Sequence, residues 1–359
     1  MDQPTPLTPT PRSPRSFVSV AALLVAILAL ILSSYAIFQI KEITDALVRE
    51  KILGVQDFLR PRRRPSPTPT PKPSPTPTST PSPVPAGAGL PFGPFHLPTT
   101  SYGTPPYTGA FLDLSKYTVA NAAAALEGAK VAKVKLIVTL GGGGSSFSDS
   151  ANRYSYTAFQ SVVDKFSSLD LTKYYNDGVV LGNLIMDEPQ DPNNWGGQTV
   201  TLTQIKQAAQ YVKSRWPTVP VGVGSSPSFL KGGGWSAEDL DFVSVPFTEN
   251  KLSCKVGRVG CYGSTVDQWI AGVVADAKAN NLGVATSINV INGGTPNGTE
   301  MTSANLQKYG TLFVSQSSAC VLTLWKWDTA YFSRSDVQSV LSAIATVAKT
   351  HAPKACRPN

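Results

Sequence analysis

The chain has 359 residues, with 31 Lys and Arg against 23 Asp and Glu, and its proline is concentrated in the first hundred residues. Residues 1–85 carry 10 of the basic and 5 of the acidic residues, which leaves 21 against 18, or +3, for residues 86–359. So balanced a charge argues against a nucleic-acid-binding face. The two histidines, His96 and His351, lie far apart, so we expect no metal site and no other cofactor.

The N-terminal part predicts a membrane anchor. After a short polar, proline-rich tail (1–16), residues 17–38 run for 22 residues without a charge, which is long enough to cross a bilayer as a helix. The run lacks a small-residue cleavage site, so we expect an uncleaved signal-anchor. Residues 39–60 predict a juxtamembrane helix, which lies on lipid or pairs chains. Residues 61–86 predict a Pro/Ser/Thr-rich stalk in extended polyproline II.

Residues 87–359 alternate strand and helix patterns, which predicts a parallel sheet. The length and the number of repeats favour a closed (β/α)8 TIM barrel over a doubly wound sheet. We expect strands at 92–97, 109–114, 135–140, 179–186, 219–224, 242–247, 284–290 and 321–327. We expect helices at 119–132, 156–166, 202–215, 266–279, 304–313 and 336–348.

Four cysteines form an even set without a CxxC spacing. Cys254 and Cys261 flank a short loop, Cys320 begins the last strand, and Cys356 follows the last helix, so both pairs can form disulfides. Two bridges favour an oxidising compartment. The segment that follows residues 17–38 has one more nearby Lys or Arg than the segment that precedes them, which slightly favours a cytoplasmic C-terminal domain. We weigh the cysteines and the stalk more heavily, and expect a single-pass protein of the cell membrane with an extracytoplasmic barrel. A cytoplasmic tethered enzyme with free thiols is the alternative.

The candidate site is Asp187-Glu188-Pro189, which ends the apolar run 179–186. In α/β barrels the residues just past a strand's carboxyl end face the active site. A glutamate at a barrel mouth, shielded by tryptophans, suits a general acid. The competing interpretation is a pair of loop or helix-capping carboxylates.

This motif resembles that of the (β/α)8-barrel glycoside hydrolases whose fourth strand ends in Asn-Glu-Pro. The resemblance implies that Glu188 is the acid/base. Asp187 stands where those families place Asn, and an Asp-Glu pair there is also similar to that of substrate-assisted hexosaminidases, where Asp orients an N-acetyl group. The last strand, LTLWKWD, resembles the eighth strand that carries a sugar-platform tryptophan, which implies this role for Trp325 or Trp327.

The chain departs from that family at the seventh strand. There the Asn-Glu-Pro enzymes place a nucleophilic Glu, whereas this strand ends in Asn289 and Asn292. A retaining mechanism needs two carboxyl groups about 5–5.5 Å apart. Glu249 and Asp328 are the nearest substitutes, although Glu249 is equally a solvated loop residue and Asp328 equally a cap. Inverting, substrate-assisted and inactive barrels all stay open.

Three further residues are candidates for substrate binding. Asn289 ends the seventh strand. His96 follows the first strand, and it is either a pocket-lining residue or one that lies outside the pocket. Trp195, in the loop after Pro189, either stacks on a sugar or packs the loop. The sequence thus predicts a membrane-anchored glycoside hydrolase acting on extracellular or cell-wall carbohydrate. Its rival is a noncatalytic carbohydrate-binding barrel displayed at the cell surface.

Overall fold

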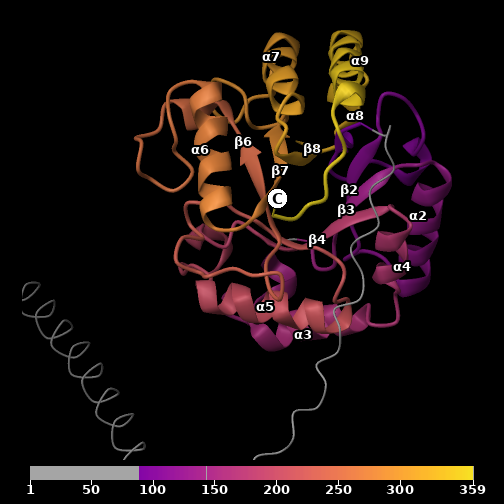
Figure 1. Cartoon of the computed structure of the whole chain (residues 1–359), viewed down its shortest axis with the longest axis vertical. Coiled ribbons are helices and arrows are strands. Elements are labelled where there is room, and N and C mark those ends of the chain that lie inside the picture. The colour runs from indigo at the N-terminus through magenta and orange to yellow at the C-terminus, as the bar shows by residue number, and fades with distance from the viewer. Residues whose placement is uncertain (1–88, 143, 359) are drawn as a thin grey trace, which may run out of the picture. The chain divides into compact units, whose positions relative to one another are not determined.

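A computed structural model describes residues 89–142 and 144–358, which fold as an eight-stranded parallel barrel (Figure 1). Seven ladders join the strands in the order β1-β8-β7-β6-β5-β4-β3-β2. The barrel closes between β1 and β2 through a parallel bridge from Phe95 to Phe111, where the amide of His96 donates to the carbonyl of Phe111 at 2.9 Å. The predicted barrel is therefore confirmed.

Each predicted strand exists, with ends that move by no more than a few residues. The bounds are β1 Phe92–Pro94, β2 Gly109–Asp113, β3 Lys135–Thr139, β4 Val180–Asp187, β5 Val221–Gly224, β6 Phe242–Phe247, β7 Gly283–Asn289 and β8 Ala319–Trp325. Most of their residues are buried on both faces, as the apolar runs predicted for a parallel sheet. The weak pattern at 109–114 is indeed the second strand, which makes β4 the fourth.

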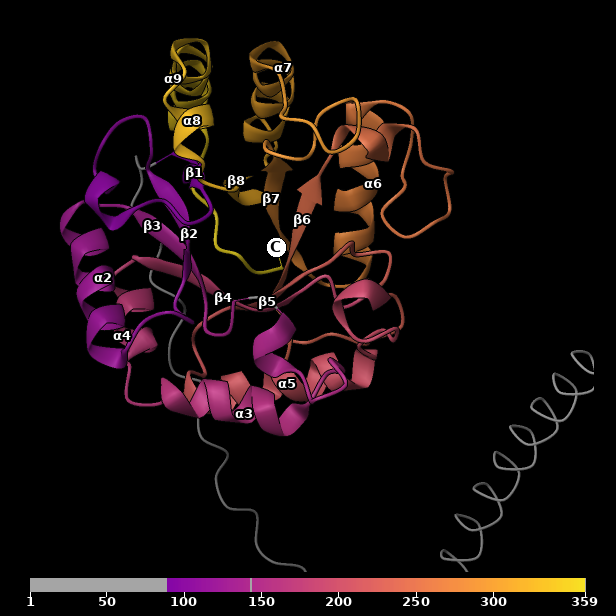
Figure 2. The same cartoon turned by 180° about the vertical axis from the view of Figure 1, so that it is seen from behind.

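Helices surround the strands (Figure 2), and all of the described α-helices except α9 (Ser335–Thr350) begin at a hydroxyl or carboxylate cap. Their bounds are α2 Val119–Val131, α3 Tyr156–Lys165, α4 Leu171–Asn176, α5 Leu202–Arg215, α6 Val266–Ala279, α7 Ser303–Val314, α8 Thr329–Phe332 and α9 Ser335–Thr350. The N-caps whose side chains accept a backbone N–H are Thr118, Ser155, Asp170, Thr201, Thr265, Thr302 and Asp328. The short helices α4 and α8 were not predicted.

The barrel departs from a regular repeat in two connections. Among residues 95–108, between β1 and β2, the only helical segment is the 3-10 turn Thr99–Ser101. Residues 225–241, all described, form no helix between β5 and β6. This segment contains Pro227 and the run Gly232–Gly234, which disfavour a helix. A loop therefore replaces the helix that a complete repeat would place here.

Apolar side chains fill the barrel interior below its mouth. Phe242 is fully buried in a cluster that also contains Phe111, Ile137 and Ala285. A Cβ on Gly222 would lie 2.3 Å from the Phe242 ring, and one on Gly182 would lie 2.6 Å from it. Glycine on β4 and β5 thus provides the space that the Phe242 ring occupies. Because the ring fills this space, it leaves no channel for a ligand at this level of the barrel.

The C-terminal tail closes the opposite end of the barrel, which we call the floor. Cys356 forms a disulfide with Cys320 at the start of β8, and both belong to the interior cluster. The next residue, Arg357, lies 3.9 Å from Asp241, which also pairs with Lys213 at 2.5 Å. The second predicted bridge, Cys254–Cys261, is present as well.

The predicted tail (1–16), membrane span (17–38), juxtamembrane helix (39–60) and stalk (61–86) lie outside the described residues and stay predictions. Among the residues that the structure describes, none of the helices has the length and apolarity that crossing a membrane requires.

Replacing Cys320 and Cys356 together by alanine is expected to lower the free energy of unfolding by about 4 kcal/mol, because the bridge restricts a long loop of the unfolded chain. Its sequence separation is 36, against 7 for Cys254–Cys261, whose removal is expected to cost about 2.5 kcal/mol. Urea unfolding of both double variants measures the two costs. A larger loss for the Cys254–Cys261 variant would contradict this account.

Candidate functional site

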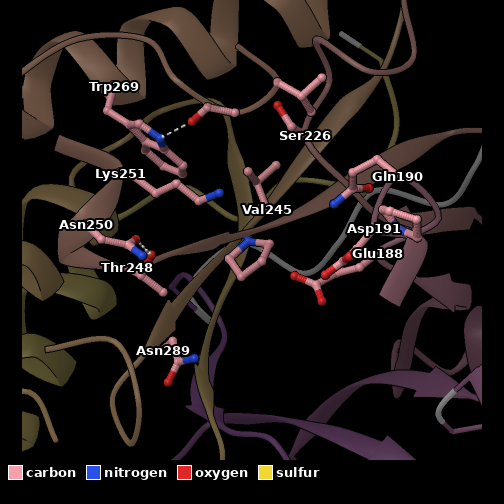
Figure 3. Close-up of a pocket in the computed structure, with 14 residues that line it drawn as sticks. Glu188, Gln190, Asp191, Ser226, Val245, Thr248, Asn250, Lys251, Trp269 and Asn289 are labelled. Carbon is pink, nitrogen blue, oxygen red and sulfur yellow. Dashed lines mark hydrogen bonds between the residues drawn. The ribbon is translucent and has the colours of Figure 1, made fainter. Parts of the chain in front are cut away.

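A pocket of about 440 Å³ opens at the carboxyl ends of β4 to β7 (Figure 3). Polar side chains dominate its rim, while Val245, Pro246 and the edge of the buried Trp269 supply apolar surface. The polar groups comprise two carboxylates (Glu188, Asp191), three amides (Gln190, Asn250, Asn289), two hydroxyls (Ser226, Thr248) and the ammonium of Lys251. Such a lining can form many hydrogen bonds with a neutral polar ligand.

Asp187 is the last residue of β4 and lies against β5. A Cβ on Gly224 would be 2.2 Å from Oδ1 of Asp187, so glycine at 224 makes room for this carboxylate. The side chain is open to water on one side, but protein surrounds the rest of it. The resulting desolvation raises the pKa of Asp187 to about 7, and the charge of Glu188 adds to the rise. Asp187 therefore retains a proton for part of the time near neutral pH.

Glu188 has a constrained backbone. Its φ of 44° lies in the left-handed region, which is unfavourable for a residue with a Cβ. Its N–H donates to the carbonyl of Gly224 at 2.7 Å, and its own carbonyl accepts from the amide of Asp191 at 3.0 Å. The Nδ2 of Asn194 donates to its carboxylate at 3.1 Å. These bonds hold the half-exposed carboxylate on the pocket wall, and strain maintained in this way is typical of functional sites.

Trp195 packs the loop and does not line the pocket. Its side chain is 1% exposed, and its ring meets that of Tyr154 edge-on at 6.0 Å. Its Nε1 donates to the carbonyl of Glu188 at 3.0 Å. The loop-packing interpretation therefore holds over sugar stacking, and Trp195 supports the backbone of Glu188 from below.

Glu249 and Asp328 do not reach the pocket. Glu249 is 9% exposed and accepts from Nδ2 of Asn305 on α7 at 2.7 Å. Asp328 caps α8 by accepting from the amide of Tyr331 at 3.0 Å. Both carboxylates are used in packing or capping, so neither is placed as the partner of Glu188.

Trp325, the last residue of β8, and Trp327, which follows the strand, differ in their surroundings. Leu324 is buried in the core outside the barrel, so the next residue, Trp325, points toward the barrel axis, and it is the register partner of Asn289. Trp327 instead stacks on Phe332 at 5.1 Å. Of the two, Trp325 lies beside Asn289, which lines the pocket.

His96 lies on the far side of the mouth, after β1, with a φ of 59°. Burial of its ring lowers the pKa of His96, the carboxylate of Asp113 opposes this shift, and Lys116 and Lys326 reinforce it. His96 does not line the pocket itself.

Sequence reasoning missed most of the polar pocket residues, namely Gln190, Asp191, Ser226, Thr248, Asn250 and Lys251. Asp191 caps a short 3-10 turn, Pro192–Asn194, and the Asp-Pro pair was the available signal. Lys251 lies in a 3-10 turn, Glu249–Leu252, and nothing in its pattern marks it as a pocket residue. Within the described ranges, no group of three or more His, Cys, Asp or Glu side chains is placed to hold a metal ion.

Comparison with family models and with curated proteins found no match. Among solved structures, the chain is similar to a GH18 chitinase from Pseudoalteromonas aurantia (14% identity, 72% of this chain and 99% of that chain, TM-score 0.45). It is also similar to a family 26 endo-beta-1,4-mannanase from Cellulomonas fimi (14%, 72% and 71%, 0.48) and to a D-psicose 3-epimerase from Clostridium cellulolyticum H10 (10%, 74% and 100%, 0.41). Such likenesses concern the fold alone, and no family is assigned.

The raised pKa of Asp187 predicts a pH-dependent stability. Because its pKa rises from 3.8 to about 7 on folding, the folded chain binds more protons between these values. Relative to Asp187→Asn, the free energy of unfolding of the wild type is expected to fall as pH rises from 3.8 to about 7, and to stay lower above pH 7. Denaturant unfolding across this range measures the difference.

The Glu188→Gln variant provides the control, because it removes the charge that contributes to the shift. The carboxyl of Asp187, followed by ¹³C NMR, is expected to titrate at a lower pH in this variant. A pH-independent difference between wild type and Asp187→Asn would contradict the assignment.

Proposed function

We propose that the barrel binds a carbohydrate chain at its mouth and hydrolyses glycosidic bonds, with Glu188 as the proton donor. The observation that carries this proposal is the placement of Asp187 and Glu188. They share one strand end, where the pKa of the Asp187 carboxyl is raised to about 7 and the Glu188 carboxylate lines a pocket of amides and hydroxyls. Sugars offer hydroxyls to such amides and carboxylates, and their C–H faces fit Val245 and Pro246.

The two adjacent carboxyl groups act as a unit. The charge of Glu188 contributes to the raised pKa of Asp187, so Asp187 holds a proton for part of the time near neutral pH. In the proposed step Asp187 passes this proton to Glu188 and Glu188 passes it to the glycosidic oxygen, the bond from that oxygen to the anomeric carbon breaks, and water adds at that carbon. Asp191 is the other carboxylate on the pocket wall and is our candidate for accepting the proton of that water.

A noncatalytic carbohydrate-binding barrel is the second candidate. It is favoured by the positions of Glu249 and Asp328, which leave the pocket without a carboxylate from β6 or β8. The seventh strand contributes Asn289, which can bind a sugar hydroxyl but cannot act as a nucleophile. Hydrolysis and binding therefore need separate measurements.

We further propose that the barrel acts outside the cytoplasm, attached to the cell membrane through residues 17–38. The two disulfides support this location, since such bridges persist in oxidising compartments. The uncharged run and the stalk support the attachment.

Glu188→Gln in the full chain is expected to lower hydrolysis by about 10²- to 10⁴-fold while binding is retained, because the amide cannot donate the carboxyl proton. Release of reducing ends from a panel of polysaccharides measures hydrolysis, and binding to the same panel is measured separately. Glu238→Gln, on an exposed loop, is the matched control and is expected to retain activity. Binding without hydrolysis by the wild type as well would identify a noncatalytic barrel.

Substitution of Trp325, which ends β8, and of Trp327, which follows it, is expected to have opposite effects. Trp325→Ala is expected to weaken glycan binding by about tenfold with little loss of stability, because its half-exposed ring supplies a stacking surface. Trp327→Ala is expected to lower the unfolding free energy by about 3 kcal/mol, because its ring packs on Phe332 and Tyr107. Equal effects of the two substitutions on binding would refute the assignment of Trp325.

A further inference from the structure

One wall of the pocket carries a cation without a counterion. Lys251 is half-buried, and Figure 3 shows its Nζ directed into the pocket, across from Glu188 and Gln190. Among the described residues, no carboxylate oxygen lies within 4.0 Å of this Nζ, and no other partner binds it. A positive charge thus faces the ligand space, and no described residue neutralises it.

The loop that continues from Lys251 is basic as well. Between Lys251 and Cys261 the sequence KLSCKVGRVGC adds Lys255 and Arg258 and contains no Asp or Glu. Both added cations are exposed, and neither forms an ion pair with a described residue. The loop also exposes Val256 (65%) and Val259 (45%), which are two of the three large hydrophobic side chains exposed in the described part of the chain.

This loop is fixed to the pocket. The Cys254–Cys261 disulfide closes it, and Sγ of Cys254 lies 3.1 Å from the carbonyl of Lys251. The amide of Gly260 donates to Oγ of Ser228 at 3.1 Å, and Nε1 of Trp269 donates to the carbonyl of Gly260 at 3.0 Å. Val259 and Gly260 line the pocket. In Figure 2 the segment between β6 and α6 extends outward beyond α6. The loop therefore continues the pocket wall beyond the mouth.

Lys251, Lys255 and Arg258 follow one another along this loop without an ion-pair partner among the described residues. Their positive charges repel one another, and a bound polyanion would reduce that repulsion. Glu188 and Asp191 lie on the opposite wall, so one wall of the pocket is negatively charged and the wall with Lys251 is positively charged. We infer that the substrate is an acidic glycan, with carboxylate or sulfate groups on its sugars. Lys251 binds the acidic group of the sugar in the pocket, and Lys255 and Arg258 bind those of neighbouring sugars. This inference rests on the proposed carbohydrate function.

A glycan fits better than a nucleic acid, which is also a polyanion. The folded part carries only +3, and a backbone with a phosphate on every nucleotide would meet both carboxylates of the opposite wall. The amide and hydroxyl rim is suited to sugar hydroxyls, and the apolar valines of the loop can contact the C–H faces of sugars.

The test is binding of the full chain to polygalacturonate, dextran sulfate and uncharged dextran at low and moderate salt. The wild type is expected to bind at least one acidic polymer about tenfold more tightly than dextran. Lys251→Met is expected to remove about tenfold of that affinity, and Lys255→Gln/Arg258→Gln to weaken the binding and reduce its dependence on salt. Tighter binding of polygalacturonate would indicate recognition of carboxylate groups, and tighter binding of dextran sulfate would indicate recognition of sulfate groups.

The matched control is Lys278→Gln/Lys349→Gln, which removes two exposed cations from the last turns of α6 and α9 and is expected to change nothing. Equal binding of dextran, or equal binding by all variants, would overturn the inference. Tighter binding of a thymidine oligonucleotide than of either acidic glycan would replace it with a nucleic-acid ligand. Hydrolysis is measured in a separate assay. A barrel that hydrolyses no glycan but binds acidic glycans through Lys251 would refute only the proposed catalysis.

Discussion

The packing of Phe242 inside a closed parallel barrel is the constraint on which the site depends. The ring fills the space left by Gly182 and Gly222, so the interior holds no ligand at that level. Parallel strands bring their carboxyl ends to one rim, and the polar groups that line the pocket gather there. The charged pair of β4, the amide of Asn289 and the ring of Trp325 therefore share this rim, although more than a hundred residues of sequence separate them.

Most of the barrel could be predicted because strands buried on both faces are continuous apolar runs and helices begin at recognisable caps. The same logic located Asp187 and Glu188, since an apolar run that stops at two carboxylates and a proline marks a strand end at the rim. The disulfide partners could be predicted because Cys320 begins a strand and Cys356 follows the antiparallel helix that returns to it. These features depend on local pattern and on the topology of the repeat.

Loop side chains could not be predicted, because their direction depends on contacts with other loops. Trp195 turns inward to bond the carbonyl of Glu188, Glu249 turns outward to Asn305, and Asp328 turns back to cap its own helix. Each of these residues follows a strand end, yet only the contacts decide which ones face the ligand. The same holds for Lys251, whose position comes from the disulfide-closed loop beside it.

The bond from the amide of Leu90 to the carbonyl of Ala348, at 2.8 Å, has a consequence for how the barrel meets its ligand. It places the first described residues beside the end of α9, at the floor, and the tail at Cys356 closes the same face. Both ends of the described chain therefore leave the barrel on the side away from its mouth. A long polymer can pass across the rim in either direction without meeting either end of the described chain.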